Sequence, residues 1–315
     1  MCPLWPRSGD EPNENIEILN EHPKHCMTFY KHRFITAAEC WYYAPVESCR
    51  ADVLHCLQLA SPLCDSRISD FKTIWIDLRK PEEQLLREMS PETRRQIRRA
   101  SEEQFKCESW HDDAPNHLEE FCRFFEEHSV TAKAIAETHR WTRAHAAHRS
   151  LDLSRVLSEQ GEVLVWHAYY RDGERARQKY SVSISRHTEA PVGAIIGRAN
   201  RWLHWQDIRR FKQDGLNVFD LGGWYPGTDD AKLLRVNNFK EGFGGEIVAA
   251  FHCTRALTPK GWIYLKTIDA RNRLVRFKDD FRRGNGPEQQ NVVEPNGRGD
   301  RTPDEVRRDS KTQRK

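Results

Sequence analysis

The stretch VLVWHAYYRDGERARQKYSVSIS, residues 163–185, carries the clearest structural pattern in this chain. Two apolar-rich segments flank a polar turn at residues 171–173, and in the second segment apolar side chains alternate with hydroxyl side chains. Alternation with a period of two is typical of a strand with one buried face. The pattern predicts a β-hairpin formed by Val163–Tyr170 and Arg177–Ser185.

Helices and single strands alternate after this hairpin. Glycine residues end several of the apolar segments, as they do at helix C-termini and tight turns. The expected elements are a helix at Ala194–Asp214, a strand at Val218–Leu221, a helix that Asp229 caps and that runs to about Lys240, a strand at Ile247–Cys253 and a helix from Pro259. Short strands mixed with longer helices predict an α/β layered domain with a mixed sheet.

The sequence before the hairpin predicts a strand followed mainly by helices. Ser90 and Pro91 provide an N-cap and a proline at the first helical position. Leu118, Phe121, Cys122 and Phe125 follow helical spacing. The expected elements are a strand at Thr73–Leu78 and helices at Pro81–Met89, Pro91–Gln104, around Leu118–Phe125 and near Leu151–Glu159.

Composition divides the chain into three parts. Residues 1–27 are interpreted as a polar arm, and residues 28–281 as the structured body. Residues 282–315 are rich in glycine, proline and charge, so we expect a disordered tail. The body can be a single unit or two halves, 28–150 and 151–281.

The bulk properties argue against several classes of protein. Nine basic and six acidic side chains of residues 282–315 account for the net charge of +3, so the body is neutral and only a local patch could bind nucleic acid. No apolar run approaches the roughly 18 residues of a membrane span, and no signal peptide precedes the body. The nine cysteines form no CxxC pair. We therefore expect a cytoplasmic protein with reduced thiols.

The fourteen histidines do not form a metal-binding pattern. His145 and His148 are three residues apart, but no acidic residue or third histidine stands at ligand spacing, and HExxH is absent. We expect no metal site.

Three segments together resemble the Fem-type branch of the GNAT acyltransferase superfamily. They are SPETRRQIRRA (90–100), GRANRWLHWQD (197–207) and FKEGFG (239–244), and their order and spacing match across about residues 70–255. The resemblance implies a GNAT-like fold. If the body contains two GNAT-like halves, we expect the second half to be the better preserved. It also implies acyl transfer, since Fem-type proteins include transferases that use aminoacyl-tRNA to build peptidoglycan cross-bridges.

The resemblance places the acyl donor beside Phe239 and Lys240. In Fem-type transferases the matching lysine is associated with the tRNA 3′ end and with stabilising the reacting ester. The long helical arm of many tRNA-using members is missing. Gly197 and Arg198 end the segment that would hold a pyrophosphate in an acyl-CoA-dependent enzyme, but their surroundings fit that glycine-rich turn poorly.

Asp220 ends a buried strand just before Gly222-Gly223. Its carboxylate could orient an amine or accept a proton, or it could be a structural group that hydrogen-bonds the glycine turn. Trp224 and Tyr225 follow the turn, and with Tyr180 they are candidates for an acceptor pocket or for core packing.

Two basic clusters stand out on the expected helices. Arg94, Arg95, Arg98 and Arg99 share one face of a helix, where they could hold phosphates or form ion pairs with nearby glutamates. The long helix carries the second cluster, Arg198, Arg201, Arg209, Arg210 and Lys212. A phosphate site would follow if both clusters faced one groove.

Three functions remain compatible with the sequence. The first is transfer of an aminoacyl group from aminoacyl-tRNA to an amine of a cell-wall precursor or small metabolite, with Lys240 and Asp220 as catalytic residues and no cofactor. The second is N-acyl transfer with acyl-CoA as co-substrate. The third is a GNAT-like binding module without activity.

Overall fold

The computed structural model describes residues 27–282 except for 33, 46–48, 129–130 and 185–189. The chain divides into two compact units, residues 1–269 and 270–315, and the first contains every strand that the structure describes. The expected arm and tail lie almost entirely outside the described residues.

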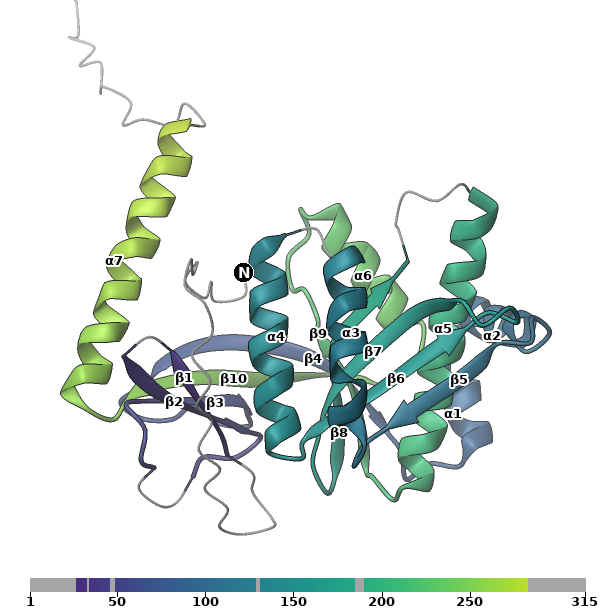
Figure 1. The fold of residues 1–315 in the computed structure, drawn as a ribbon, viewed down its shortest axis with the longest axis horizontal. Helices are drawn as coiled ribbons and strands as arrows, with labels where there is room; N and C mark the ends of the chain where they lie inside the picture. Colours follow the sequence, from purple (N-terminus) through teal and green to yellow (C-terminus); the bar gives the residue numbers. More distant parts are fainter. Residues whose placement is uncertain (1–26, 33, 46–48, 129–130, 185–189, 283–315) are drawn as a thin grey trace, which may run out of the picture. The chain divides into compact units, whose positions relative to one another are not determined.

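One mixed sheet of ten strands runs through the first unit, in the order β1-β2-β3-β10-β4-β9-β8-β7-β6-β5 (Figure 1). Among these strands, β2 with β3 and β8 with β9 are parallel pairs, and the other neighbours are antiparallel. The strands are β1 (Thr28–His32), β2 (Ile35–Trp41), β3 (Val53–Leu59), β4 (Arg67–Asp77), β5 (Lys106–Trp110), β6 (Leu151–Leu157), β7 (Val163–Arg171), β8 (Arg175–Ser183), β9 (Val218–Gly223) and β10 (Glu246–Ala256).

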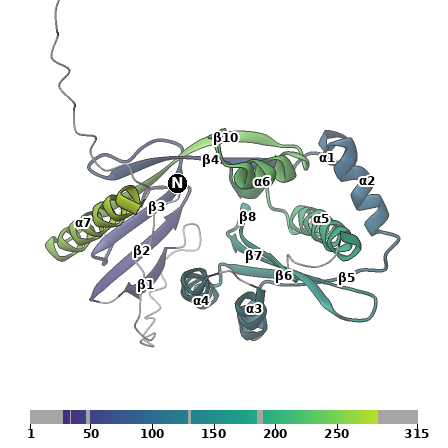
Figure 2. The same ribbon diagram turned by 90° about the horizontal axis from the view of Figure 1, so that it is seen from above.

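Helices cover both faces of the sheet. α5 and α6 lie on one side and α3 and α4 on the other, as Figure 2 shows from above, while α1 and α2 adjoin α5. The helices are α1 (Glu82–Glu88), α2 (Pro91–Ala100), α3 (Ala114–His128), α4 (Ala132–Ala147), α5 (Ala190–Gln213), α6 (Ala231–Glu241) and α7 (Pro259–Arg282).

Each covered face has its own apolar core. On the α5 side, residues of α1, α2, α5 and β9 pack together, with Phe211, Phe219 and Phe243 fully buried. On the α3 and α4 side, Phe121 and Trp166 are fully buried. Burial of one large apolar side chain contributes about 1.5–3 kcal/mol, so these two clusters hold the helices on the sheet.

The main expectations of the sequence are confirmed. The mixed α/β sheet is present, the hairpin is β7 and β8, and the Ser90 side chain caps α2 by accepting a hydrogen bond from the Thr93 N–H at 3.1 Å. Strands and helices after the hairpin follow in the expected order. The long helix begins at Ala190 rather than Ala194, and Asp230 rather than Asp229 caps α6.

The helix expected near Leu151–Glu159 is wrong, because residues 151–157 form strand β6. This segment lies between β5 and β7, where its apolar side chains are buried. The Asp152 carboxylate is fully buried in this strand, and Arg171 and Arg210 bind it at 3.1 and 2.7 Å.

A buried polar cluster joins β2 to α4. The Glu39 carboxylate accepts hydrogen bonds from the Trp41 indole at 2.8 Å and from Nε2 of His145 at 3.2 Å. Nδ1 of His145 lies 2.7 Å from the Ser150 hydroxyl. Burial alone would raise the pKa of Glu39, but the hydrogen bond from His145 and the positive potential around the carboxylate lower it to about 2.

We expect this cluster to make the fold sensitive to acid. The pKa of Glu39 is lower in the folded state than its usual value of 4.5, so its contribution is fully present above pH 4.5 and is lost as the pH falls towards 2. The contribution is on the order of 3 kcal/mol. Urea unfolding between pH 7 and 2.5 measures it, and Glu39→Gln should flatten the acid limb of the profile.

Glu126→Gln is the matched control, since Glu126 pairs with His139 at 3.0 Å on the surface. An exposed pair of this kind contributes at most about 1 kcal/mol. If Glu39→Gln and the wild-type protein lost stability in parallel between pH 5 and 2.5, the proposed role of Glu39 would be wrong.

Candidate functional site

The parallel strands β8 and β9 pair over a short stretch and then diverge. Residues 175–177 pair with residues 218–220, whereas β8 continues to Ser183 and β9 to Gly223. α5 is the crossover connection between them. Where the two strands diverge, their backbone N–H and C=O groups no longer bond to each other, and such groups can bind an extended substrate. The point of divergence is therefore a candidate site.

Gly222 occupies the point of divergence. Its φ of +76° lies in the left-handed region, which strains any residue with a Cβ. A Cβ here would also come within 2.9 Å of the Gln178 carbonyl oxygen on β8. Only glycine lets the two backbones approach in this way.

Two cationic side chains converge on Gly222. Lys240, in the last turn of α6, donates a hydrogen bond of 2.7 Å from Nζ to the Gly223 carbonyl. Nζ of Lys240 and Nη2 of Arg177 lie 3.8 and 3.9 Å from the position that a Cβ on Gly222 would occupy. Positive groups fixed at one place can stabilise an oxyanion that develops there.

Asp220 lies beneath this point and is fully buried. Its Oδ1 accepts hydrogen bonds from the Thr73 hydroxyl and, at 2.7 Å, from the Gly222 N–H. The carboxylate thus holds the glycine turn, which is the structural role considered from the sequence. Its Oδ2 has no hydrogen-bond partner among the described residues and lies 3.9 Å from Nε of Arg177.

Sequence reasoning missed Arg177. Its guanidinium lies 4.7 Å from the Trp41 ring and 5.9 Å from the Phe71 ring, so aromatic side chains of β2 and β4 fix its position. A signal was present in the sequence, since Arg175 and Arg177 alternate with apolar or uncharged residues along β8. A mainly buried arginine on a central strand is rare enough to indicate a function.

Phe239 stands beside Lys240 in an aromatic cluster. Its ring lies 5.4 Å from the rings of His204 and Phe243, and the Arg201 guanidinium lies 4.8 Å from it. Burial lowers the pKa of His204 well below its ordinary value, so this imidazole is neutral. The Gln178 side chain contacts Nε2 of His204 at 2.9 Å. The cluster therefore connects α6 and α5 to the diverging part of β8.

The three segments that resemble the Fem-type family meet here. Segment 90–100 forms α2, and the Ser90 N–H donates a hydrogen bond of 2.9 Å to the Gly242 carbonyl in segment 239–244. Segment 197–207 lies in α5, which packs against α2 and, through Arg201 and His204, against Phe239. Residues far apart in the sequence thus pack around Phe239 and Gly242, which flank Lys240.

The two donor candidates on α5 do not form a phosphate-binding turn. Gly197 lies in the second turn of the helix, where backbone N–H groups bond to the preceding turn, and its carbonyl accepts a hydrogen bond from Arg201 at 3.2 Å. Nε of Arg198 donates to Glu103 at 2.7 Å. Residues 185–189, which belong to the candidate pyrophosphate segment, lie outside the described residues.

The three acceptor-pocket candidates lie in two places. Trp224 and Tyr225 follow β9 and are joined to α6, since the Trp224 indole donates to Glu241 at 2.5 Å and the Tyr225 N–H donates to Asn237 at 2.9 Å. Tyr180 packs in the core on the other side of the sheet, 5.5 Å from the Phe125 ring. The structure therefore does not bring Tyr180 together with the other two.

Most of the basic residues expected to form a surface on α5 are already paired with other groups of the chain. Arg209 pairs with Glu82 at 3.0 Å, Arg210 binds Asp152 at 2.7 Å, and Nζ of Lys212 donates to the Leu78 carbonyl at 2.8 Å. These contacts tie α5 to α1 and to the sheet. The second basic cluster is consequently structural in large part.

Within the described residues, no group of three or more histidine, cysteine, aspartate or glutamate side chains is placed to hold a metal ion. The helices that the structure describes include none long and apolar enough to cross a membrane. The seven cysteines among these residues are free thiols.

The fold is similar to that of FemX. The two structures have a TM-score of 0.51 and 11% sequence identity, over 72% of this chain and 83% of FemX. A C-terminal domain of a lysylphosphatidylglycerol synthetase from Agrobacterium fabrum matches with a TM-score of 0.44 and 11% identity, over 77% of this chain and 84% of that one. No family model and no curated protein sequence matches this chain. The expected Fem-type, GNAT-like fold is confirmed.

We expect Gly222→Ala to damage the site more than left-handed strain alone would. Gly215 is the matched control, because its φ is +82° but a Cβ there would meet nothing within 4 Å. Gly215→Ala should cost about 1–2 kcal/mol of unfolding free energy from the strained backbone. Gly222→Ala should cost at least about 1 kcal/mol more, because the Gln178 carbonyl must move.

Denaturant unfolding of the two variants makes this comparison. Equal losses of stability would mean that β8 and β9 are not held in close contact at Gly222.

Proposed function

We propose that this protein is an acyltransferase that moves an aminoacyl group from aminoacyl-tRNA to an amine, forming an amide. The observation that carries the proposal is the convergence of Lys240 and Arg177 at Gly222, where β8 and β9 diverge. The Fem-type resemblance of segment 239–244 supports the choice of donor, and the fold shared with FemX is consistent with it.

The reaction needs little more than orientation and charge. The neutral amine attacks the carbonyl carbon of the aminoacyl ester, and a tetrahedral intermediate with an oxyanion forms. The ester C–O bond then breaks, the amine loses one proton, and the ribose hydroxyl of the tRNA leaves with a proton. Aminoacyl esters are already activated, so that fixing the two reactants together supplies much of the rate.

Lys240 is the residue that we place at the oxyanion. Its Nζ is held by the Gly223 carbonyl, so the charge is oriented before the substrate arrives. Phe239 precedes it and packs against His204, where it can contact the donor. The Arg177 guanidinium is the second cation at Gly222 and would share the oxyanion, while the buried Asp220 carboxylate holds the Gly222 N–H beneath both. The acceptor is an amine of a cell-wall precursor or a small metabolite.

Acyl-CoA remains the second candidate donor. The position of Gly197 inside α5 disfavours a glycine-rich pyrophosphate turn there. A binding module without activity is the third candidate, which the convergence of two cations at Gly222 disfavours.

Replacing Lys240 tests the proposal. With a mixture of labelled aminoacyl-tRNAs and a mixture of amine acceptors, Lys240→Ala should lower the rate of transfer by about 10²–10³-fold, the usual cost of removing one oxyanion donor. Lys232→Ala is the matched control, because Lys232 is an exposed lysine at the other end of α6. The control should retain wild-type activity.

The same assay with acyl-CoA separates the two donors. Transfer from acyl-CoA but not from aminoacyl-tRNA would overturn the proposed donor and retain the reaction type. Transfer from aminoacyl-tRNA that survives Lys240→Ala would mean that another residue stabilises the oxyanion.

A further inference from the structure

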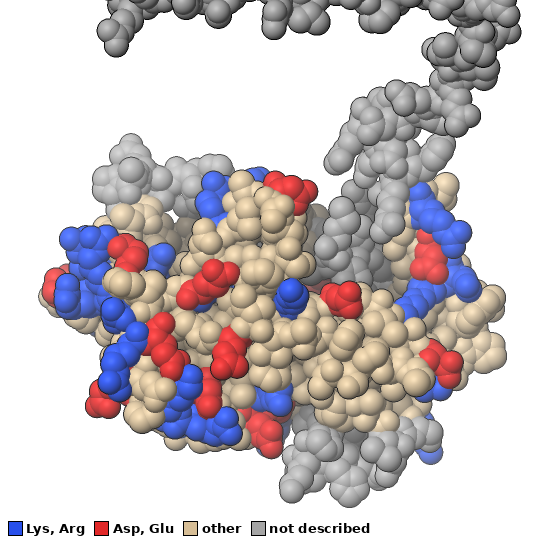
Figure 3. Space-filling view, turned by 180° about the vertical axis from the view of Figure 1, so that it is seen from behind, with Lys and Arg blue, Asp and Glu red and all other residues tan. Residues whose placement is uncertain are grey.

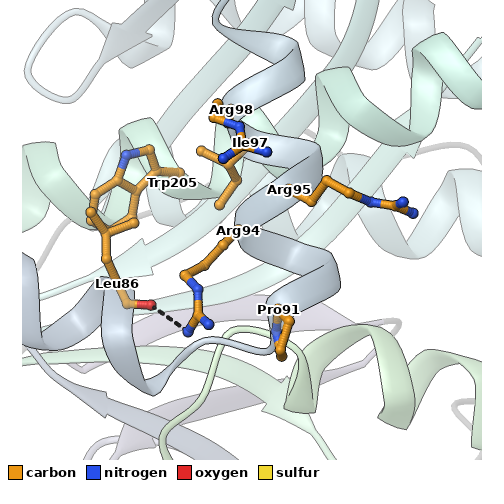
Figure 4. Close-up of a pocket in the computed structure, with 7 residues that line it drawn as sticks. All are labelled: Leu86, Pro91, Arg94, Arg95, Ile97, Arg98 and Trp205. Atoms are coloured by element: carbon orange, nitrogen blue, oxygen red, sulfur yellow. Dashed lines mark hydrogen bonds between the residues drawn. The ribbon is translucent and has the colours of Figure 1, made fainter.

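An open groove lies between α1, α2 and α5. It has a volume of about 550 Å³ and is lined by Leu86, Pro91, Arg94, Arg95, Ile97, Arg98 and Trp205 (Figure 4). Its apolar floor comes from all three helices, and its three charged lining residues are arginines from one face of α2. No carboxylate lines it.

The three arginines differ in how far they are already engaged. Nη1 of Arg94 donates to the Arg87 and Met89 carbonyls at 2.9 and 2.6 Å, so this side chain caps the end of α1. Arg95 pairs with Glu92 at 2.6 Å, on the exposed surface. The Arg98 side chain is exposed and has no hydrogen bond or ion pair among the described residues. Arg98 is therefore available to an anion. Arg95 becomes available when an anion replaces Glu92, since a surface ion pair of this kind is weak.

The surface around this groove is rich in charge. Figure 3 shows the molecule from behind, and charged side chains gather over its left part, which corresponds to the region of α1, α2 and α5 at the right of Figure 1. Basic (blue) and acidic (red) side chains are interspersed in this part of the view. Residues 1–281 carry no net charge, so the positive charge of the groove comes from the three arginines that line it and not from overall composition.

The groove is connected to the proposed reaction centre by a short path. Pro91 lies at its lower end in Figure 4, next to Ser90, whose N–H bonds to the Gly242 carbonyl at 2.9 Å. Gly242 follows Lys240 by two residues. At the floor of the groove, Trp205 belongs to the same apolar cluster as Phe239. Through Ser90 and Trp205, the groove is thus in contact with the segment that carries Phe239 and Lys240.

We propose that this groove binds the single-stranded 3′ end of the donor tRNA, with Arg98 and Arg95 contacting its phosphates and the apolar floor contacting a base. The proposal rests on the function proposed above. Arginines that carry exposed guanidinium groups bind phosphates, and apolar and aromatic side chains support unstacked bases of single-stranded RNA. The absence of a lining carboxylate gives the charge complementarity that an RNA strand needs.

Binding of uncharged tRNA over a salt series tests the groove without requiring transfer. Arg98→Ala and the double variant Arg95→Ala/Arg98→Ala should weaken binding by about 3-fold and 10-fold at low salt, and should reduce the slope of log K against log salt by about 0.7 per lost phosphate contact. Arg123→Ala is the matched control, since Arg123 is an exposed arginine on α3, across the sheet. Alanine favours helices, so the variants should fold.

A minimal donor, aminoacyl-adenosine, separates the groove from the reaction centre. The double variant should raise KM about 10-fold with full-length aminoacyl-tRNA and leave kcat/KM with aminoacyl-adenosine unchanged, because the minimal donor carries no phosphates. An unchanged salt slope in the double variant would overturn the groove as the tRNA site. The groove would also be overturned if the wild-type protein bound coenzyme A more tightly than tRNA and the double variant no longer bound coenzyme A.

Failure of the groove and failure of the proposed function give different results. If the wild-type protein transferred from both donors and the double variant retained full affinity for tRNA, only the groove would be wrong. If the wild-type protein transferred from neither donor, the proposed function would be wrong, whereas loss of tRNA binding in the double variant would still support the groove.

Discussion

The close approach of β8 and β9 at Gly222 is the constraint on which the site depends. Because residue 222 has no side chain, its N–H can bond to Asp220 while the Gln178 carbonyl of β8 lies directly above it. Beyond this point the strands separate, and the Gly223 carbonyl is left to hold Lys240. One left-handed residue thus sets the end of a strand pair, the orientation of a buried carboxylate and the place of a cation.

Two other buried carboxylates of the sheet, those of Asp152 and Glu39, have partners that compensate their charge. Asp152 is neutralised by Arg171 and Arg210, and Glu39 receives N–H groups from aromatic side chains and a histidine. Arg177 is different, because its nearest carboxylate is 3.9 Å away and its Nε has no partner among the described residues. Compensated charges stabilise a fold, whereas an incompletely satisfied charge beside a strand end indicates a binding function.

The sequence predicted those parts of the fold in which local patterns and long-range contacts agree. The hairpin of residues 163–185, the Ser90 cap and the glycine-ended strand at Asp220 all have local signals that tertiary packing reinforces. Prediction failed where a contact between residues far apart in the sequence decides whether a charged side chain is buried or exposed. The segment from Leu151 is a strand in which Arg210, 58 residues away, neutralises the buried Asp152, and no local pattern shows this pairing. Strands β1 to β3 and β5 and helix α4 were likewise missed. Lys240 is a candidate because of the resemblance alone, whereas the position of Arg177 depends on Trp41, which no spacing in the sequence connects to it.

The arrangement of α2 shows how a distant surface can take part in the chemistry. Its N-terminus is bonded to Gly242, and its arginines line a groove whose floor shares a core with Phe239. Contacts made along α2 do not touch the reacting ester, so they cannot stabilise an oxyanion directly. They can hold a long donor in register with Lys240, and binding energy from remote parts of a substrate is then used to orient its reactive end. In the function proposed above, one short helix would position a large donor without touching its reactive end.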